Sequence, residues 1–168
     1  MQRQICVNNS RPVECEETGM TGQGPIVFPT DFSAASLAGL PWAKRLTRFM
    51  ETQLHVIYAA VEPQIFRVLE IEVGQAVQPS VDELITGAET RLQAFVAAHL
   101  DGLDLPVIPR ILVGNPADEI IQYADEVAAA MIVIGAHGYS GVRHLILGST
   151  TESTLQHAQC PVLCVKAE

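Results

Sequence analysis

The sequence predicts an α/β fold in which helices cover both faces of a five-stranded parallel sheet. Short apolar runs alternate with amphipathic segments along the 168 residues, as in strand–helix–strand units with right-handed crossovers. Hydrophobic residues make up 48% of the chain and aromatic residues only 5%, and such aliphatic interiors are typical of parallel sheets buried on both faces. Five such strands commonly take the order 3-2-1-4-5, although hydrophobic periodicity does not fix that order.

Five apolar runs are expected to form the strands. The first begins at Pro25 and ends in Pro29-Thr30-Asp31, and each of the others is short and bounded by turn residues or by a helical segment. The strands after the first are predicted at residues 54–61, 106–113, 131–135 and 161–165.

Four helices are expected between these strands. Ser33 can cap a helix that runs to Phe49, and Pro41 inside this segment indicates a kink or a later start. Asn115-Pro116 is a strong helix opening because asparagine caps a first turn and proline fits into it. The later helices are predicted at about residues 80–102, 116–128 and 149–157.

The chain is predicted to contain one packed domain, residues 25–168, after a flexible leader at residues 1–24. The leader mixes charged and small polar residues without a helical or strand period. The apolar stretches are too short to span a bilayer, and the N-terminus lacks the apolar core of a secretory signal. We therefore expect a cytoplasmic protein with no membrane partner.

Charge and cysteine content narrow the function classes further. Ten basic and nineteen acidic residues give a formal charge of −9, which disfavours a nucleic-acid partner. The four cysteines, Cys6, Cys15, Cys160 and Cys164, have no zinc-site spacing and are expected to be reduced. A small phosphate ligand stays compatible with the acidic chain because backbone amides can hold it locally.

A glycine-rich loop, GAHGYSGVRHLILGST, spans residues 135–150 between the fourth strand and the last helix. Glycines let backbone amides approach an anion closely, and a helix start adds the positive end of its dipole. The loop is neither a Walker loop, since no lysine precedes Ser149, nor a dinucleotide fingerprint. The simpler interpretation is that the glycines only turn the chain and Ser149 only caps a helix. The full spacing favours a phosphate cradle.

In a sheet of order 3-2-1-4-5, ligands bind where the strand order reverses, beyond the carboxyl ends of the first and fourth strands. Pro29-Thr30-Asp31 would then face the loop that begins at Gly135.

From IVFPTDFS to MIVIGAHGYSGVRHLILGSTTESTLQHAQCPVLCVK, the chain resembles the universal stress protein family. The likeness covers residues 25–166. It implies a Rossmann-like fold of the adenine-nucleotide α-hydrolase-like group, and the pattern of three glycines followed by serine places the chain with the ATP-binding members of the family.

The resemblance also implies which residues touch the nucleotide. The backbone around Gly135, Gly138 and Gly148 would hold the phosphates with hydroxyl groups from the last helix, and Asp31 would take a ribose hydroxyl or a divalent ion, Mg²⁺ or Mn²⁺. Tyr58-Ala59 replaces a common His-Val pair, and the smaller Ala59 would loosen the adenine pocket. The expected contacts are Pro29, Thr30, Asp31, Ala59, Ile134, Gly135, His137, Gly138, Gly148, Ser149, Thr150 and Thr151.

Several of these residues have simpler interpretations. Asp31 alone is equally well read as a turn or secondary-cap aspartate. His137 is interpreted as structural or phosphate-orienting, because no partner acid lies beside it in the sequence. Arg143 and His144 fit either a phosphate contact or the outside of the loop. The remaining histidines, His55, His99 and His157, are interpreted as packing or surface residues.

The resemblance implies an ATP-dependent stress-response sensor or switch, at most a slow ATPase or autokinase. In this reading nucleotide occupancy orders residues 136–149 and biases association. Residues 162–166 would pair with a second copy to form a homodimer. The alternative is a nucleotide-free dimeric adaptor that works through protein contacts. A third reading, an AMP-transferring enzyme, would need a second substrate pocket, for which residues 62–79 are the candidate region.

Overall fold

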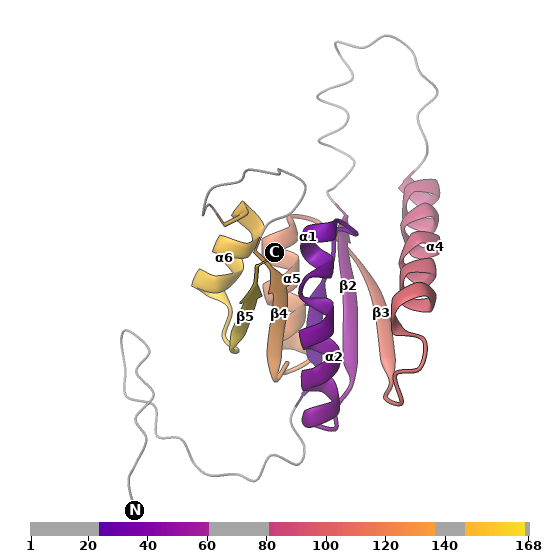
Figure 1. Ribbon diagram of the computed structural model, residues 1–168. Helices are drawn as coiled ribbons and strands as arrows, with labels where there is room; N and C mark the ends of the chain where they lie inside the picture. Colours follow the sequence, from indigo (N-terminus) through magenta and orange to yellow (C-terminus); the bar gives the residue numbers. More distant parts are fainter. Residues whose placement is uncertain (1–23, 61–80, 137–146, 167–168) are drawn as a thin grey trace, which may run out of the picture.

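The computed structural model describes residues 24–60, 81–136 and 147–166, apart from the side chains of residues 81–84. A five-stranded, wholly parallel sheet forms its centre, in the order β3-β2-β1-β4-β5 (Figure 1). The predicted order and strand direction are therefore confirmed. The strands are β1 Ile26–Pro29, β2 Leu54–Ala60, β3 Val107–Val113, β4 Met131–Gly135 and β5 Val162–Val165.

Strand β1 lies at the centre of the sheet, where the order reverses. Ile26 aligns with Leu54 of β2 on one side and with Met131 of β4 on the other. Because the chain moves from β1 outward to β2 and β3 and from β4 outward to β5, the connections that follow β1 and β4 lead to opposite sides of the sheet. The edge at the carboxyl ends of these two strands is where such sheets bind ligands.

The predicted first helix is divided into two. Ser33 caps α1, since its Oγ accepts from the Ser36 amide at 3.1 Å, and α2 begins again after Gly39 with Pro41 in its first turn. A proline has no amide hydrogen to donate to the carbonyl of Leu37, four residues earlier, so one continuous helix would lose a backbone bond there. The helices are α1 Ala34–Leu37, α2 Leu40–Phe49, α4 Val81–Leu100, α5 Pro116–Glu126 and α6 Ser149–His157.

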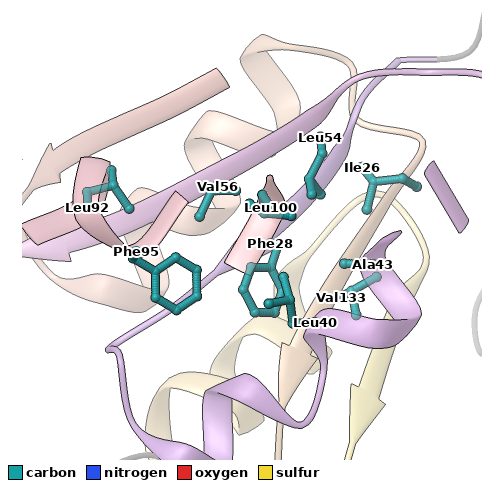
Figure 2. Packing of buried hydrophobic residues seen from close by; sticks show 10 residues of the cluster. All are labelled: Ile26, Phe28, Leu40, Ala43, Leu54, Val56, Leu92, Phe95, Leu100 and Val133. Atoms are coloured by element: carbon teal, nitrogen blue, oxygen red, sulfur yellow. The ribbon is translucent and has the colours of Figure 1, made fainter. Parts of the chain in front are cut away.

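Helices cover both faces of the sheet, as expected. Alternate residues of β1 point to opposite sides: Ile26 and Phe28 pack with α2 and α4, whereas Val27 packs with α5. Figure 2 shows the first of these two clusters, in which Leu92 and Phe95 of α4 approach Val56 and Phe28 of the sheet. With β1 fully buried on both sides, the strand is held rigidly where the next residues enter the cavity.

The smaller predictions have mixed outcomes. Asn115 caps α5 as predicted, accepting from the Ala117 amide at 3.0 Å, and Cys160 and Cys164 are free, half-buried thiols. No helix in the described part of the chain is long and apolar enough to cross a membrane. The predictions for residues 1–23, for 62–79, and for Cys6, Cys15, Arg143 and His144 lie outside the described residues.

Candidate functional site

A cavity of about 350 Å³ opens at the carboxyl ends of β1 and β4, the edge predicted for ligand binding. It contains every residue of the predicted nucleotide site except His137 and Gly138, which lie outside the described residues. Ser36, Pro116 and Ile120 also line it and were not predicted. The lining residues are Pro29, Thr30, Asp31, Ser36, Ala59, Pro116, Ile120, Ile134, Gly135, Gly148, Ser149, Thr150 and Thr151.

The turn after β1 is fixed by its own hydrogen bonds. Thr30 Oγ1 lies 3.0 Å from Ser36 Oγ and accepts from the Phe32 amide at 3.0 Å. Asp31 Oδ1 accepts from the backbone amide of Ser33 at 2.9 Å and from its hydroxyl. The turn role considered for Asp31 is therefore present. Both contacts use Oδ1, so Oδ2 is not engaged by them and can serve the cavity.

Phe32, the next residue, adopts a left-handed backbone with φ of 63°, a conformation that is uncommon for a bulky side chain. Its ring stacks on Tyr58 at 4.9 Å and meets the edge of Phe95 at 5.6 Å between ring centroids. The Arg91 guanidinium lies 4.5 Å from the centre of the Phe32 ring. Tyr58, noted as a departure from the common family pattern, thus helps to anchor the residue that follows Asp31.

The opposite wall of the cavity is the start of α6. Gly148 is the N-cap, with no side-chain cap hydrogen bond, and its amide donates to the carbonyl of Ala136 at 3.0 Å. Ser149 is the first helical residue and so does not cap the helix, contrary to the simpler interpretation of the sequence. Because the N-cap residue is a glycine, it has no side chain to occupy the amide donors of the first turn, and these lie with the positive end of the helix dipole beside the cavity.

Thr151 has a structural bond of its own. Its hydroxyl donates to the carbonyl of Gly135 at 2.8 Å and is buried, so α6 is tied to the end of β4. A hydroxyl has one hydrogen, and in this arrangement that hydrogen is not available to a phosphate. Ser149 and Thr150, which also line the cavity, are the better placed hydroxyl donors.

Gly135 is needed for the close packing of α1 on β4. A Cβ atom at this position would lie 2.6 Å from the carbonyl oxygen of Ala35 and 2.9 Å from the Ser36 Cα. The glycine therefore lets α1 approach the floor of the cavity and brings Ser36 into the lining.

The remaining wall of the cavity is apolar, and two of its residues come from the start of α5. Ile120 and Ile134 are 2% and 5% exposed, and they line the cavity together with Ala59 and Pro116. Pro116 and Ile120 are four residues apart on one helix face. This spacing can be seen in the sequence, but the sequence alone does not show that this side of α5 lines the cavity.

The described residues contain no group of three or more His, Cys, Asp or Glu side chains that could hold a metal ion by themselves. Asp31 contributes a single carboxylate to the cavity. Magnesium is commonly bound by one or two carboxylates together with substrate phosphates and water, so this lining fits a nucleotide-borne ion better than a resident metal.

The histidines expected to be structural lie elsewhere. His55 is buried and its Nδ1 lies 2.9 Å from the Tyr123 hydroxyl, whereas His99 and His157 are exposed. None of the three lines the cavity.

Residues 24–166 match the model of the universal stress protein family. The chain belongs to this family. It is 30% identical over 141 residues to the universal stress protein MJ0531 of Methanocaldococcus jannaschii. The alignment covers 84% of this chain and 81% of the relative. The confirmed family and sheet order agree with the resemblance noted from the sequence.

Solved structures of family members share the fold. The protein MJ0577 of the same organism superposes with a TM-score of 0.70 at 26% identity, over 86% of this chain and 96% of that one. A universal stress protein from Archaeoglobus fulgidus, solved in complex with dAMP, gives a TM-score of 0.58 at 23% identity, over 85% and 98% of the two chains.

Proposed function

We propose that this universal stress protein binds ATP in the cavity at the ends of β1 and β4, and that nucleotide occupancy acts as a switch in a stress response. The observation that supports this most strongly is the pairing of opposite walls: a helix start with a glycine N-cap and the turn that contains Asp31 line one cavity, beside an apolar wall. A pocket that is mostly apolar with a few convergent polar groups is typical of nucleotide-sized ligands.

Each wall suits one part of the nucleotide. The amides of the α6 first turn and the hydroxyls of Ser149 and Thr150 would bind the phosphates, because they are donors at a positive helix end. Asp31 Oδ2 would accept a ribose hydroxyl or hold a Mg²⁺ or Mn²⁺ ion that the phosphates share. The apolar group of Ala59, Pro116, Ile120 and Ile134 would pack on the base and sugar.

The loop residues that the sequence adds to this site, His137 and Gly138, belong to the same proposal. Their contribution is inferred from the motif alone: the glycine for close approach of amides, and the histidine for orienting a phosphate. The proposal is also consistent with the acidic charge of the chain, since backbone donors act at short range.

The lining supports binding more than rapid turnover. Asp31 is the one titratable side chain among the described lining residues, and it already accepts two hydrogen bonds at Oδ1. A general base must reach the proton of an attacking water. We therefore propose at most slow hydrolysis or autophosphorylation.

The A. fulgidus relative solved with dAMP shows that an adenine nucleotide is held by a protein of this fold.

The test compares two cavity variants with matched controls. Ser149→Ala and Asp31→Ala should each weaken ATP binding about tenfold, the usual effect of losing a hydrogen bond to a charged group. Ser153→Ala, one turn further along α6 and outside the cavity, and the exposed Asp101→Ala should bind like the wild type. Affinities are measured with a fluorescent ATP analogue in the presence of Mg²⁺. Equal affinity in all four variants would refute the proposed site.

The second candidate, a nucleotide-free dimeric adaptor, draws on the position of β5. This strand is one edge of the sheet, and an apolar edge is commonly protected by pairing. Both candidates predict a homodimer through residues 162–166, seen as twice the chain mass by light scattering at micromolar concentration. A monomer would contradict both. Mass spectrometry of acid-released small molecules separates them, because only the switch copurifies with nucleotide.

A further inference from the structure

The outward side of α2 is both aromatic and basic. Trp42 and Phe49 are 47% and 77% exposed, and they lie seven residues apart, two turns along the same side of the helix. Arg45 lies between them, with its guanidinium 5.8 Å from the centre of the Trp42 ring. We call the surface formed by Trp42, Arg45, Arg48 and Phe49, all of them exposed, the α2 face.

The other side of the helix accounts for its packing on the sheet without these residues. Leu40, Ala43 and Thr47 are buried, and the Thr47 hydroxyl donates to the carbonyl of Ala43 at 2.8 Å. The exposed rings are therefore not needed to hold α2 in place. A phenylalanine that is three-quarters exposed beside an exposed tryptophan indicates a surface that contacts a partner rather than side chains needed for packing within the domain.

The charge of the α2 face opposes that of the whole chain. The ten residues of α2 include Lys44, Arg45 and Arg48 and no acidic residue, although the formal charge of the chain is −9. Acidic side chains of α5, among them Asp118, Asp125 and Glu126, lie beyond the opposite face of the sheet. A single helix is about 10 Å across, so the α5 acids are more than a Debye length, about 8 Å at physiological salt, from this face.

The acidic residues described on this side of the sheet lie outside α2, and besides Glu51 and Glu89 they include the exposed Asp101 and Asp104 beyond the end of α4. Glu51 follows α2 directly and is exposed, and Glu89 is exposed on α4, which covers the same side of the sheet. None of these acids belongs to α2, whose exposed cations Arg45 and Arg48 lie nearest to the two exposed rings.

The size of the α2 face decides which partner fits it. A stable protein interface usually buries about 800 Å² on each side, whereas a helix of ten residues is about 15 Å long and offers one side only. A membrane surface makes a smaller demand: aromatic side chains enter the boundary between headgroups and acyl chains, while cations meet anionic headgroups.

We propose that the α2 face docks on the surface of an anionic phospholipid membrane. Phe49 and Trp42 enter the interfacial layer, and Arg45 and Arg48 contact lipid phosphates. This proposal departs from the sequence-based expectation of no membrane partner, which considered spanning segments; the described part of the chain has no spanning helix, and a surface contact needs none. The proposal does not depend on nucleotide binding: α2 runs from the cavity edge toward the amino ends of the strands, so Phe49 lies at the far end from the cavity (Figure 1).

Trp42 is the single tryptophan of the chain, so its fluorescence reports directly on this surface. With the full chain and vesicles of phosphatidylcholine and phosphatidylglycerol, we expect a blue shift of the emission and cosedimentation of the protein. Vesicles of phosphatidylcholine alone should give neither. High salt should reverse the binding because the cations would be screened.

Variants then identify the residues. Arg45→Gln and Arg48→Gln should each weaken partition to the anionic vesicles about fivefold, and Phe49→Ala should abolish much of the blue shift. The control Arg110→Gln removes one exposed cation of β3, beside Tyr123 on the side of the sheet that α5 covers, and should bind like the wild type.

Three results would overturn the proposal. One is the absence of binding to anionic vesicles by the wild-type chain. Another is equal loss of binding in the Arg110→Gln control, which would indicate a general charge effect. The third is a Trp42 emission that shifts with protein concentration and not with vesicles, which would assign the α2 face to contact between copies of the chain.

Discussion

At the residue scale, the hydrogen bond from Thr151 to Gly135 distinguishes a structural role of the Thr151 hydroxyl from a role in binding a ligand. Thr151→Val keeps the shape of the side chain but leaves the buried carbonyl of Gly135 without this donor, so it should reduce the free energy of unfolding by about 1–3 kcal/mol. Thr151→Ser, which keeps the hydroxyl, should lose clearly less. Urea denaturation of the ligand-free chain measures both. If Thr151→Val proved as stable as the wild type, the hydroxyl would be free for a phosphate, as the family resemblance implied.

His55 and Tyr123 form a second buried pair, between β2 and α5. Burial, with a smaller contribution from the positive charge of Arg110, lowers the pKa of His55 below 6.5, and burial raises the pKa of Tyr123. A neutral His55 can accept the Tyr123 hydrogen at Nδ1 and donate from Nε2 to Gln53 Oε1, 3.3 Å away. Protonation would place a hydrogen on both ring nitrogens and oppose the bond to Tyr123.

This pair makes stability depend on pH. Because the pKa of His55 is lower in the folded state than in the unfolded state, its contribution is complete above pH 6.5 and is lost as the pH falls through the folded-state pKa. Unfolding free energies measured by urea from pH 7.5 to 5 should decline, and His55→Gln should flatten the decline. The exposed His157→Gln serves as the control. An identical slope in the His55 variant would show that other groups cause the decline.

At the scale of elements, the close packing of α1 on β4 depends on Gly135. Gly135→Ala would place a Cβ atom 2.6 Å from the Ala35 carbonyl oxygen, and we expect it to cost about 1–3 kcal/mol, as for other overpacked sites. Gly87 of α4 is the matched control, since a Cβ there meets nothing within 4 Å. Gly87→Ala should stabilise the chain by about 0.5–1 kcal/mol through helix propensity. Thermal unfolding of both variants checks the difference in sign; destabilisation by both would contradict this account of Gly135.

The elements that the sequence predicted best are those with a local signal. Strand β4 and helix α6 have the predicted bounds, and Ser33 and Asn115 cap helices as expected, because apolar runs and capping residues act within a few positions. The division of α1 from α2 was open in the sequence, since Pro41 fits either a kink or a first turn. Close packing of Gly39 against Phe28 accompanies the break, and that contact joins residues of different elements.

At the scale of the whole molecule, most of the described residues that line the cavity were named from the sequence, and tertiary contacts add the others. The glycine loop and Pro29-Thr30-Asp31 indicated the two walls from sequence alone. Ser36 and Ile120 could not be assigned to the cavity in this way, because their place depends on how closely α1 approaches β4 and on where α5 crosses the sheet. The strand order was likewise expected only because it is common among such sheets. The pairing of β1 with both β2 and β4 establishes it.

The measurement that tests the central claim most directly is isothermal titration calorimetry of the full chain with ATP in the presence of Mg²⁺. The account predicts a saturable heat of binding with one nucleotide per chain, which weakens in Asp31→Ala and Ser149→Ala and persists in Ser153→Ala. Absence of heat and of saturation at millimolar nucleotide would contradict it.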